Sequence, residues 1–408
     1  MTPDLLELEV GAPAAGGACV ARDADGRVVF VRHALPGERV RAVVTATTTS
    51  FLRADAVEVL RASPHRVRPP CPFAGPGRCG GCDYQHVTVP EQRALKAALV
   101  AEQLHRLAGT SYDVTVEEVP GAPDGLGWRT RVQWAVDGAG RVGLHRHRSR
   151  ELELVDRCRI ATEGAQLPLT ASWPGVSAVE AFSLAGQTVL SVRGRPAPLP
   201  AIDAGLVVNG RPLRTPHGMR VPVLGRSFEV AAGAFWQVHP GAAAELAQAV
   251  LDGLEPVPGE RVVDLYAGVG LFAALLGQAV GPTGSVLAVE GEPRACADAA
   301  RNTADLPWVK VRTGAVDAKL VSAGVGRPSL VVLDPPRAGA GLALSAALVG
   351  LAPRRIAYVA CDPASFARDL RVFLDAGWTM PSLRAFDLFP MTEHVELVAI
   401  LERPGVSP

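Results

Sequence analysis

The sequence has no excess of charge of either sign and no apolar run long enough to cross a membrane. Its 41 basic (Lys and Arg) and 41 acidic residues cancel, so a surface that binds nucleic acid would be a local patch. The longest apolar run, at 342–352, is interrupted by Ser345 and is shorter than the ~20 residues of a membrane-spanning helix. The N-terminal residues include acids and precede no apolar stretch, unlike a secretory signal. We therefore expect a cytoplasmic protein with no membrane partner.

Cysteine is scarce, and its count is odd. The seven cysteines are Cys19, Cys71, Cys79, Cys82, Cys158, Cys296 and Cys361. An odd count without a secretory signal argues against a disulfide framework and favours metal or thiol chemistry. A chain of 408 residues, of which 48% are hydrophobic, is long enough for two or three domains with their own cores.

The first domain, expected over residues 1–62, has the pattern of a small β-barrel. Short apolar runs at 27–31 and 38–44 are bounded by Gly and Pro, and Asp25-Gly26 is a hairpin turn signal. The region is similar to the TRAM domain, an OB-like module of RNA-modifying enzymes. A structural barrel without a ligand is the alternative.

A group of cysteines opens the second domain, expected over residues 63–225. Cys71, Cys79 and Cys82 are closely spaced, and a Gly-Gly pair lets the chain bend so that the last two thiolates can face one centre. The spacing indicates a metal site, and both zinc and an iron–sulfur cluster are consistent with it. Cys158 is the available fourth ligand, with His86 as an alternative for zinc.

A helix is predicted over residues 88–108 and could pack on the last domain. Thr88 and Glu91 form a capping-box pattern, Pro90 lies in the first turn, and Gly109 follows the end. Strands are predicted from 127 to 158. Basic residues are concentrated there, and they suit either phosphate contacts or a solvated face: Arg129, Arg131, Arg141, His145, Arg146, His147, Arg148 and Arg150.

The third domain, expected over residues 226–408, begins with a strand, a glycine-rich turn, a helix and a strand at 261–290. Gly268 and Gly270 would let the backbone approach a ligand, and Glu290 would end the second strand, where a carboxylate can hold two ribose hydroxyls. A nicotinamide site uses similar parts. The pattern D-L-Y-x-G-x-G instead resembles motif I of class I S-adenosylmethionine methyltransferases.

Three later segments are expected to meet at one edge of the sheet. Buried strands are predicted to end just before Asp334 and Cys361, and adjacent strands would place these side chains side by side. In the class I order the last strand, 394–401, runs antiparallel beside the Cys361 strand. His394 and Glu396 at its start would then face the same crevice. Taken alone, Cys361 is more typical of an ordinary buried cysteine, and the neighbouring motifs reverse that interpretation.

Four motifs, in order, resemble the RNA uracil-5-methyltransferase family: D-L-Y-A-G-V-G, L-D-P-P-R-A-G, A-C-D-P and F-P-M-T-E-H-V-E. The motif C-P-x(6)-C-x(2)-C, together with Cys158, resembles the iron–sulfur members, which methylate 23S ribosomal RNA. The resemblance implies an α/β fold: a class I (Rossmann-like) methyltransferase domain, an N-terminal OB-like β-barrel and an α+β central domain, in a monomer. It also implies methyl transfer from S-adenosylmethionine to C5 of a uridine in RNA, through a covalent Cys–C6 adduct.

The resemblance assigns roles to individual residues. Cys361 would be the nucleophile and Glu396 the base that removes the C5 proton. The expected contacts of S-adenosylmethionine are Gln237, Tyr266, Gly268, Gly270, Glu290 and Asp334. A 4Fe–4S cluster, or zinc as the alternative, would be held by Cys71, Cys79, Cys82 and Cys158. The sequence departs from the family pattern at His239, Ala267, Leu271 and Asp362.

Three other functions remain open at this point. The enzyme could act on tRNA, it could be an amino-directed nucleic-acid methyltransferase, or it could be an RNA-binding protein with an inactive methyltransferase fold. An amino-directed enzyme would carry D-P-P-Y, whereas Arg337 follows Asp334-Pro335-Pro336 here. The intact pair of Cys361 and Glu396 argues against an inactive fold.

Overall fold

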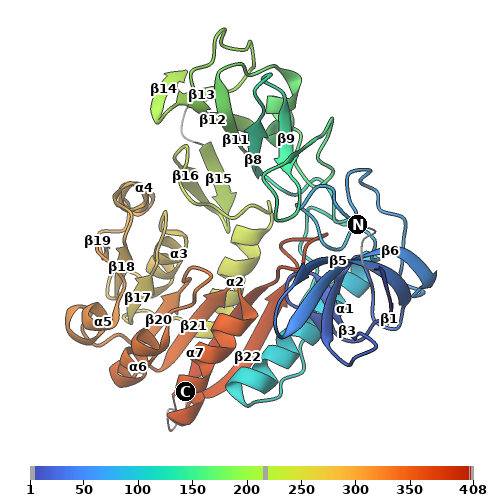
Figure 1. Ribbon diagram of the computed structural model, residues 1–408. Helices are drawn as coiled ribbons and strands as arrows, with labels where there is room; N and C mark the ends of the chain where they lie inside the picture. Colours follow the sequence, from blue (N-terminus) through green and yellow to red (C-terminus); the bar gives the residue numbers. More distant parts are fainter. Residues whose placement is uncertain (1–4, 215–218, 404, 406–408) are drawn as a thin grey trace.

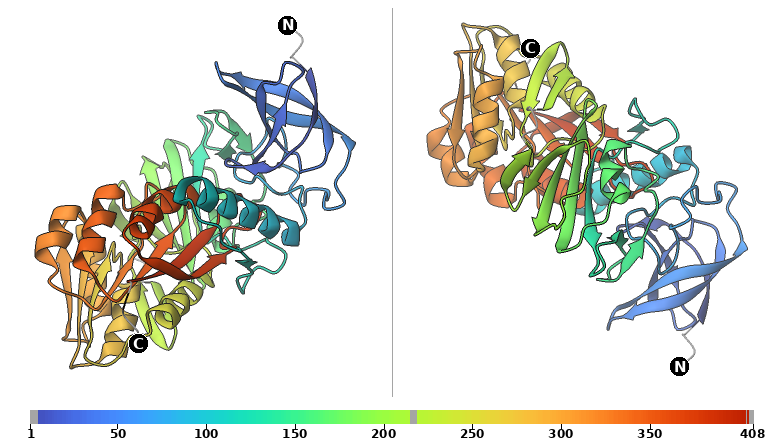
Figure 2. Two further views of the ribbon diagram at one scale, coloured as in Figure 1. Left: turned by 90° about the horizontal axis from the view of Figure 1, so that it is seen from below. Right: turned by 90° about the horizontal axis from the view of Figure 1, so that it is seen from above.

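Three β-rich bodies follow one another along the chain (Figure 1). The structure is a computed structural model that describes residues 5–214, 219–403 and 405. Figure 2 shows the N-terminal body at one end of an elongated molecule and the C-terminal sheet with its helices at the other. Among the described residues, no helix is both long and apolar enough to cross a lipid bilayer.

The N-terminal body is a six-stranded sheet in the order β1-β5-β6-β4-β3-β2. Its strands are β1 (Leu5–Glu9), β2 (Pro13–Ala14), β3 (Ala18–Arg22), β4 (Val28–Arg32), β5 (Arg39–Thr47) and β6 (Phe51–Arg61). Alternate side chains such as Leu8, Val29 and Val40 form the core, as expected for strands with one buried face. The predicted turn is confirmed, since the Gly26 amide donates to the Asp23 carbonyl at 3.0 Å.

The central body is a seven-stranded sheet in the order β10-β9-β8-β11-β12-β13-β14, next to the hairpin β15-β16. The elements are β8 (Arg131–Val136), β9 (Val142–His145), β10 (Leu152–Leu154), the 3-10 helix η2 (Gly164–Thr170), β11 (Val176–Leu184), β12 (Gln187–Gly194), β13 (Gly205–Val208), β14 (Arg211–Arg214), β15 (Met219–Val223) and β16 (Arg226–Val230). Trp134 and Trp173 are fully buried, and each donates its indole N–H to a backbone carbonyl of the η2 segment, which satisfies the one polar atom of each ring.

The C-terminal body is an eight-stranded sheet in the order β19-β18-β17-β20-β21-β23-β22-β7. Its strands are β17 (Arg261–Leu265), β18 (Ser285–Glu290), β19 (Val309–Thr313), β20 (Leu330–Leu333), β21 (Arg355–Ala360), β22 (Thr379–Phe386), β23 (Glu396–Glu402) and β7 (Val116–Glu117). The strands from β19 to β21 are parallel, and β23 is antiparallel to both of its neighbours. The helices are α2 (Ala242–Leu254), α3 (Leu271–Val280), α4 (Pro293–Asn302), α5 (Ala318–Gly324), α6 (Leu342–Leu351) and α7 (Pro363–Asp375).

The helix predicted over 88–108 consists of α1 (Val89–Gln103) and a π-helical turn, η1 (Leu104–Ala108). Pro90 lies in the first turn and Gly109 ends the helix with a φ of 69°, as predicted. The capping box is wrong, because the Thr88 side chain makes no capping hydrogen bond and only its carbonyl accepts from Gln92.

The segment around α1 is built into the C-terminal body, although the central sheet follows it in the chain. Val100, Leu104 and Ala108 belong to the apolar core under β20 and β21, and β7 pairs with β22. The side chains of this helix therefore bury their apolar face against the C-terminal core. The domain limits near residues 62 and 225 stay predictions.

Candidate active site

A cavity of about 740 Å³ opens at the carboxyl ends of the parallel strands, where open α/β sheets bind their ligands. Seven residues predicted for the catalytic and cofactor sites line it: Gln237, Tyr266, Gly268, Glu290, Asp334, Cys361 and Glu396. They come from segments spread over 160 positions of the sequence, between residues 237 and 396. The fold therefore brings the two predicted sites into one space.

Strand pairing explains why three of these side chains meet. Asp334 and Cys361 each follow the last residue of a parallel strand, β20 and β21, and these strands are neighbours. Glu396 begins β23, which is antiparallel to β21 with Ala360 opposite Leu397. Pro363 starts α7 and prevents β21 from continuing. The predicted adjacency of the three segments is confirmed.

The acidic groups at this edge of the sheet are buried in surroundings that disfavour their charged forms. Glu396 is 3% exposed, and burial raises its pKa well above the ordinary value, with the neighbouring Asp334 carboxylate raising it further. Burial also raises the pKa of Asp334. Two carboxyl groups so close together do not both ionise easily, so the pair tends to retain a proton.

The thiol of Cys361 is also protonated at neutral pH. Burial raises its pKa to about 11, and the charges of Glu396 and Asp334 act in the same direction. Arg337 opposes this effect, since its positive charge lowers the pKa of both Cys361 and Glu396. A nucleophilic role for Cys361 therefore requires a group that accepts the thiol proton.

At the ends of β17 and β18, the glycine-rich turn and Glu290 line the same cavity and hold each other in place. The amide of Gly268 donates to one carboxylate oxygen of Glu290 at 2.9 Å, and the amide of Glu292 donates to the other at 2.8 Å. Tyr266 has a φ of 62°, a left-handed conformation that only a few per cent of non-glycine residues adopt. Such strained residues concentrate at functional sites.

Of the residues predicted to contact S-adenosylmethionine, Gly270 alone does not line the cavity. Its φ is 87°, and a Cβ atom there would lie 3.1 Å from both the Cα and the Cβ of Ala299. The glycine lets the start of α3 pack closely against α4, which sets the position of the turn above it.

Arg337 and Phe389 line the cavity although they were not predicted to face it, and His394 lines it as predicted. Arg337 Nη2 lies 2.9 Å from His394 Nε2, and the Phe389 ring meets the His394 ring edge-on at 6.0 Å between centroids. Arg337 and His394 lie inside two of the motifs, so their place in sequence was the available signal. The fold adds the direct contact between these two side chains.

The four predicted metal ligands lie in two loops that approach each other. Cys158 follows β10 in a loop and not in a strand, contrary to the prediction. Burial raises the pKa of Cys79 to about 11, with the charges of Cys158 and Cys71 adding to it. The pKa of Cys82 is raised by burial and by the same neighbours. The four sulfurs are thus close enough to interact electrostatically.

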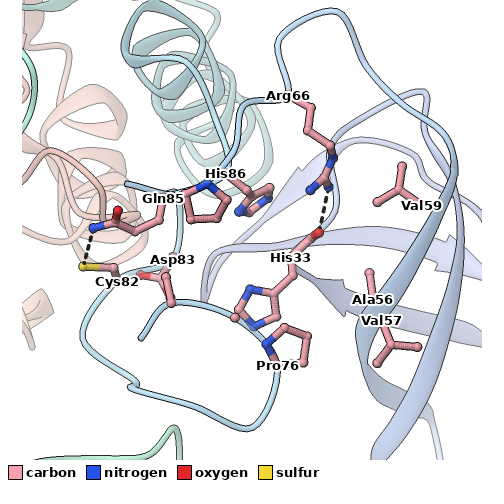
Figure 3. Close-up of a pocket in the computed structure, with 13 residues that line it drawn as sticks. His33, Ala56, Val57, Val59, Arg66, Pro76, Cys82, Asp83, Gln85 and His86 are labelled. Atoms are coloured by element: carbon pink, nitrogen blue, oxygen red, sulfur yellow. Dashed lines mark hydrogen bonds between the residues drawn. The ribbon is translucent and has the colours of Figure 1, made fainter. Parts of the chain in front are cut away.

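Within the described residues, no group of three or more His, Cys, Asp and Glu side chains has the arrangement that holds a single metal ion. His86, the alternative zinc ligand, packs near His33 and Arg66, while Cys82 points the other way and accepts a hydrogen bond from Gln85 at 3.4 Å (Figure 3). The chemistry of the donor set, four thiols from two loops, would nevertheless suit an iron–sulfur cluster, which cysteine thiolates hold.

Three of the eight basic residues predicted to form a phosphate-binding face have acidic partners. Arg131 pairs with Glu180, and Arg141 pairs with Asp137. Arg146 contacts two glutamates, at residues 151 and 153. The positive charges of Arg131, Arg141 and Arg146 are therefore largely balanced within the protein.

The fold and the site define a class I S-adenosylmethionine-dependent methyltransferase. The sheet is parallel up to β21 and carries one antiparallel strand between β21 and β22, and the glycine-rich turn follows β17. A solved structure with a TM-score of 0.74 has the same fold over 97% of this chain and 100% of its own, at 21% identity: the Pyrococcus abyssi tRNA (uracil-54, C5)-methyltransferase in complex with S-adenosyl-L-homocysteine.

Comparisons of sequence identify the family. Residues 5–57 match the TRAM domain, and residues 327–404 match the tRNA (Uracil-5-)-methyltransferase family. An RNA methyltransferase of Streptomyces coelicolor is 49% identical over 97% of this chain and 92% of its own length. The 23S rRNA (uracil(1939)-C(5))-methyltransferase RlmD of Alkalilimnicola ehrlichii is 33% identical over 93% of this chain and 92% of its own.

This chain belongs to the RNA uracil-5-methyltransferase family. It is an S-adenosylmethionine-dependent enzyme that acts on RNA, with a TRAM domain at its N-terminus. The predicted fold class and reaction class are confirmed.

Proposed function

We propose that the enzyme methylates C5 of a uridine in 23S ribosomal RNA through a covalent bond between Cys361 and C6 of the uracil. The observation that carries this proposal is that the Cys361 thiol and the Glu396 carboxyl line one cavity, at the ends of paired strands. The identity of 33% to a 23S rRNA enzyme over nearly the whole chain favours ribosomal RNA. A target base must leave the RNA stack to reach such a cavity.

The reaction needs a thiolate, because C5 of uracil is a poor nucleophile until a group adds to C6. In the reactive form both carboxyls are ionised, and the Cys361 thiol gives its proton to Asp334, whose raised pKa makes it a suitable acceptor. Glu396 stays ionised for the later step. Sulfur then adds to C6 of uracil, and the resulting enolate at C5 attacks the methyl group of S-adenosylmethionine. The bond between the methyl group and the donor sulfur breaks, its electron pair stays on that sulfur, and S-adenosylhomocysteine is the by-product.

The intermediate still carries a hydrogen on C5, which Glu396 removes as a general base. The electrons of that C–H bond restore the C5–C6 double bond and expel the Cys361 sulfur. Arg337 stabilises the negative charge that moves between sulfur and carboxylate, since it lies close enough to affect the pKa of both groups. The methyl donor would be held by Gln237, Tyr266, Gly268, Glu290 and Asp334, with Gly270 shaping the turn.

We also propose that Cys71, Cys79, Cys82 and Cys158 hold a 4Fe–4S cluster, which joins the two loops. The donor set and the mutual proximity of the sulfurs support it, and zinc is the alternative. Anaerobically purified protein should contain about four iron atoms per chain and show the visible absorbance of an iron–sulfur cluster. Stoichiometric zinc without iron would favour a zinc site.

RNA containing 5-fluorouridine tests the covalent mechanism, because fluorine at C5 cannot be removed as a proton. With S-adenosylmethionine present, the wild-type enzyme should form an RNA–protein adduct that survives denaturation. The Cys361→Ala variant should form none and should still bind RNA. If the wild-type enzyme forms no adduct with fragments of 23S rRNA or with tRNA, the covalent mechanism is wrong. An adduct that forms with tRNA and not with 23S rRNA would show that the substrate is tRNA.

A further inference from the structure

The segment 387–394 connects β22 to the residue before Glu396 and lies between the cavity and the N-terminal half of the chain. Phe389, His394 and Glu396 line the cavity. The opposite side of the segment is held by residues nearly 300 positions earlier in the sequence. We call residues 387–394 the strap.

Helix α1 holds the strap at two places. Gln92 is fully buried, and its side-chain oxygen accepts a hydrogen bond from the Met391 amide at 2.8 Å. The side-chain nitrogen of Gln92 donates to the carbonyls of Tyr84 and Val87 at 3.2 and 2.9 Å. One turn further along, the ammonium of Lys96 lies 2.6 Å from Asp387 Oδ1 and 3.1 Å from the Phe389 carbonyl.

The loop after Cys82 and the TRAM domain also hold the strap. The amides of Asp83 and Tyr84 both donate to the Met391 carbonyl at 2.9 Å. The carboxylate of Glu393 accepts from the amides of Gly16 and Gly17, the latter at 2.9 Å. A Cβ on Gly17 would lie 2.4 Å from the Cβ of Asp83, so this close approach requires glycine.

Met391 shows that these contacts impose a conformation on the strap. Its φ is 67°, a left-handed conformation that persists in a side chain of this kind only where the surroundings enforce it. Its amide is bound by Gln92 and its carbonyl by two amides, so both sides of the residue are fixed. Five residues later, Glu396 begins β23.

We propose that Gln92 is a positioning residue for the catalytic carboxyl: by holding Met391, it keeps the strap in the form that aligns Glu396 with Cys361. The inference rests on the proposed role of Glu396 as the base. Gln92 lies outside the cavity lining and contacts the strap through the Met391 amide and sulfur. A misalignment of about 1 Å in an active site can cost about 100-fold in rate.

The test compares full-length Gln92→Met with a matched control, Gln103→Met. Both glutamines are buried on α1, but the side chain of Gln103 bonds to Glu102 and Arg106 and not to the strap. Turnover is expressed per active site, counted by the adduct with 5-fluorouridine RNA, so that a partly unfolded preparation does not affect the result. The second readout is covalent adduct with ordinary uridine RNA.

For Gln92→Met we expect kcat per site to fall about 10- to 100-fold, with the KM for S-adenosylmethionine within about twofold of wild type. Adduct with ordinary RNA should accumulate, because sulfur addition and methylation proceed while proton removal is slow. Gln103→Met should show neither change. If the two variants turn over at the same rate per site and neither accumulates adduct, Gln92 has no positioning role. If wild-type enzyme fails to form the 5-fluorouridine adduct, the covalent mechanism itself is wrong.

Discussion

At the scale of single residues, the active site holds acidic groups in an environment that suits their neutral form. The pKa of Glu396 is raised well above its ordinary value by burial and by Asp334. A carboxyl with a raised pKa favours folding below the ordinary pKa of glutamate, about 4.3, and this contribution is lost as the pH rises through the folded-state value. Glu396 therefore lowers the stability of the folded protein as the solution becomes alkaline.

We expect Glu396→Gln to be more stable than wild type at pH 8.5 and nearly equal to it at pH 4, because the amide cannot acquire a charge. Thermal unfolding across this pH range measures the difference. Glu151→Gln, at an exposed carboxylate, should show no such trend. A difference in Tm that shrinks as the pH rises would contradict the direction of the pKa shift.

The same Glu396→Gln variant should lose at least about 100-fold in turnover, the usual contribution of a general base. Ordinary uridine RNA should remain bound to it covalently, since sulfur addition and methylation do not require Glu396. Denaturing gel electrophoresis after incubation with S-adenosylmethionine measures the trapped fraction. Turnover equal to wild type would remove Glu396 from the mechanism.

At the scale of elements, the residue after Cys361 has a structural role that bears on one departure from the family pattern. The Asp362 carboxylate accepts from the Ser365 amide at 2.7 Å and caps α7, with Pro363 in the first turn. Asparagine, which commonly follows the nucleophile in this family, caps a helix equally well. Aspartate in place of asparagine at residue 362 therefore still caps the helix that follows Cys361.

Asp362→Ala should lower the free energy of unfolding by about 1 kcal/mol, the usual cost of losing an N-cap. Asp362→Asn should change it by no more than a few tenths, since its side-chain oxygen still accepts the hydrogen bond. Chemical denaturation of both variants makes the comparison. An equal loss in the two variants would mean that the negative charge, and not the cap, stabilises this turn.

At the scale of the whole molecule, one buried ion pair joins parts of the chain that are 291 residues apart, Lys96 on α1 and Asp387 at the start of the strap. The two side chains are 0% and 2% exposed. Removing one partner of a buried pair leaves an uncompensated charge, which costs about 3–5 kcal/mol. The pair thus makes the fold of the C-terminal sheet depend on a helix from the N-terminal half.

Lys96→Met should therefore destabilise the protein by about 3–5 kcal/mol. The double variant Lys96→Met with Asp387→Asn should recover part of that loss, because neither residue then carries a buried charge. Urea unfolding of the two single variants and the double variant measures the coupling. Strictly additive losses would show that the two residues do not interact.

The site was largely predictable from sequence because its residues lie inside short motifs. Asp334, Cys361 and Glu396 each lie at a strand end that apolar runs and prolines define locally, and the class I strand order places those ends together. The capping box at Thr88 failed for a different reason. A side-chain cap is one weak interaction, and the tertiary contacts of Gln92 in the same turn override it.

By itself, the sequence determined the secondary structure around the motifs, the absence of charge excess and the chemistry of the reacting groups, because these depend on residues near one another in the chain. Only the tertiary structure decided that α1 and β7 join the C-terminal body, that Arg131 and Arg146 are neutralised by acidic partners, and that Gln92 holds Met391. Those outcomes depend on contacts between distant segments, for which local pattern carries no information. Hydrogen bonds across 299 residues form only when the whole molecule has folded.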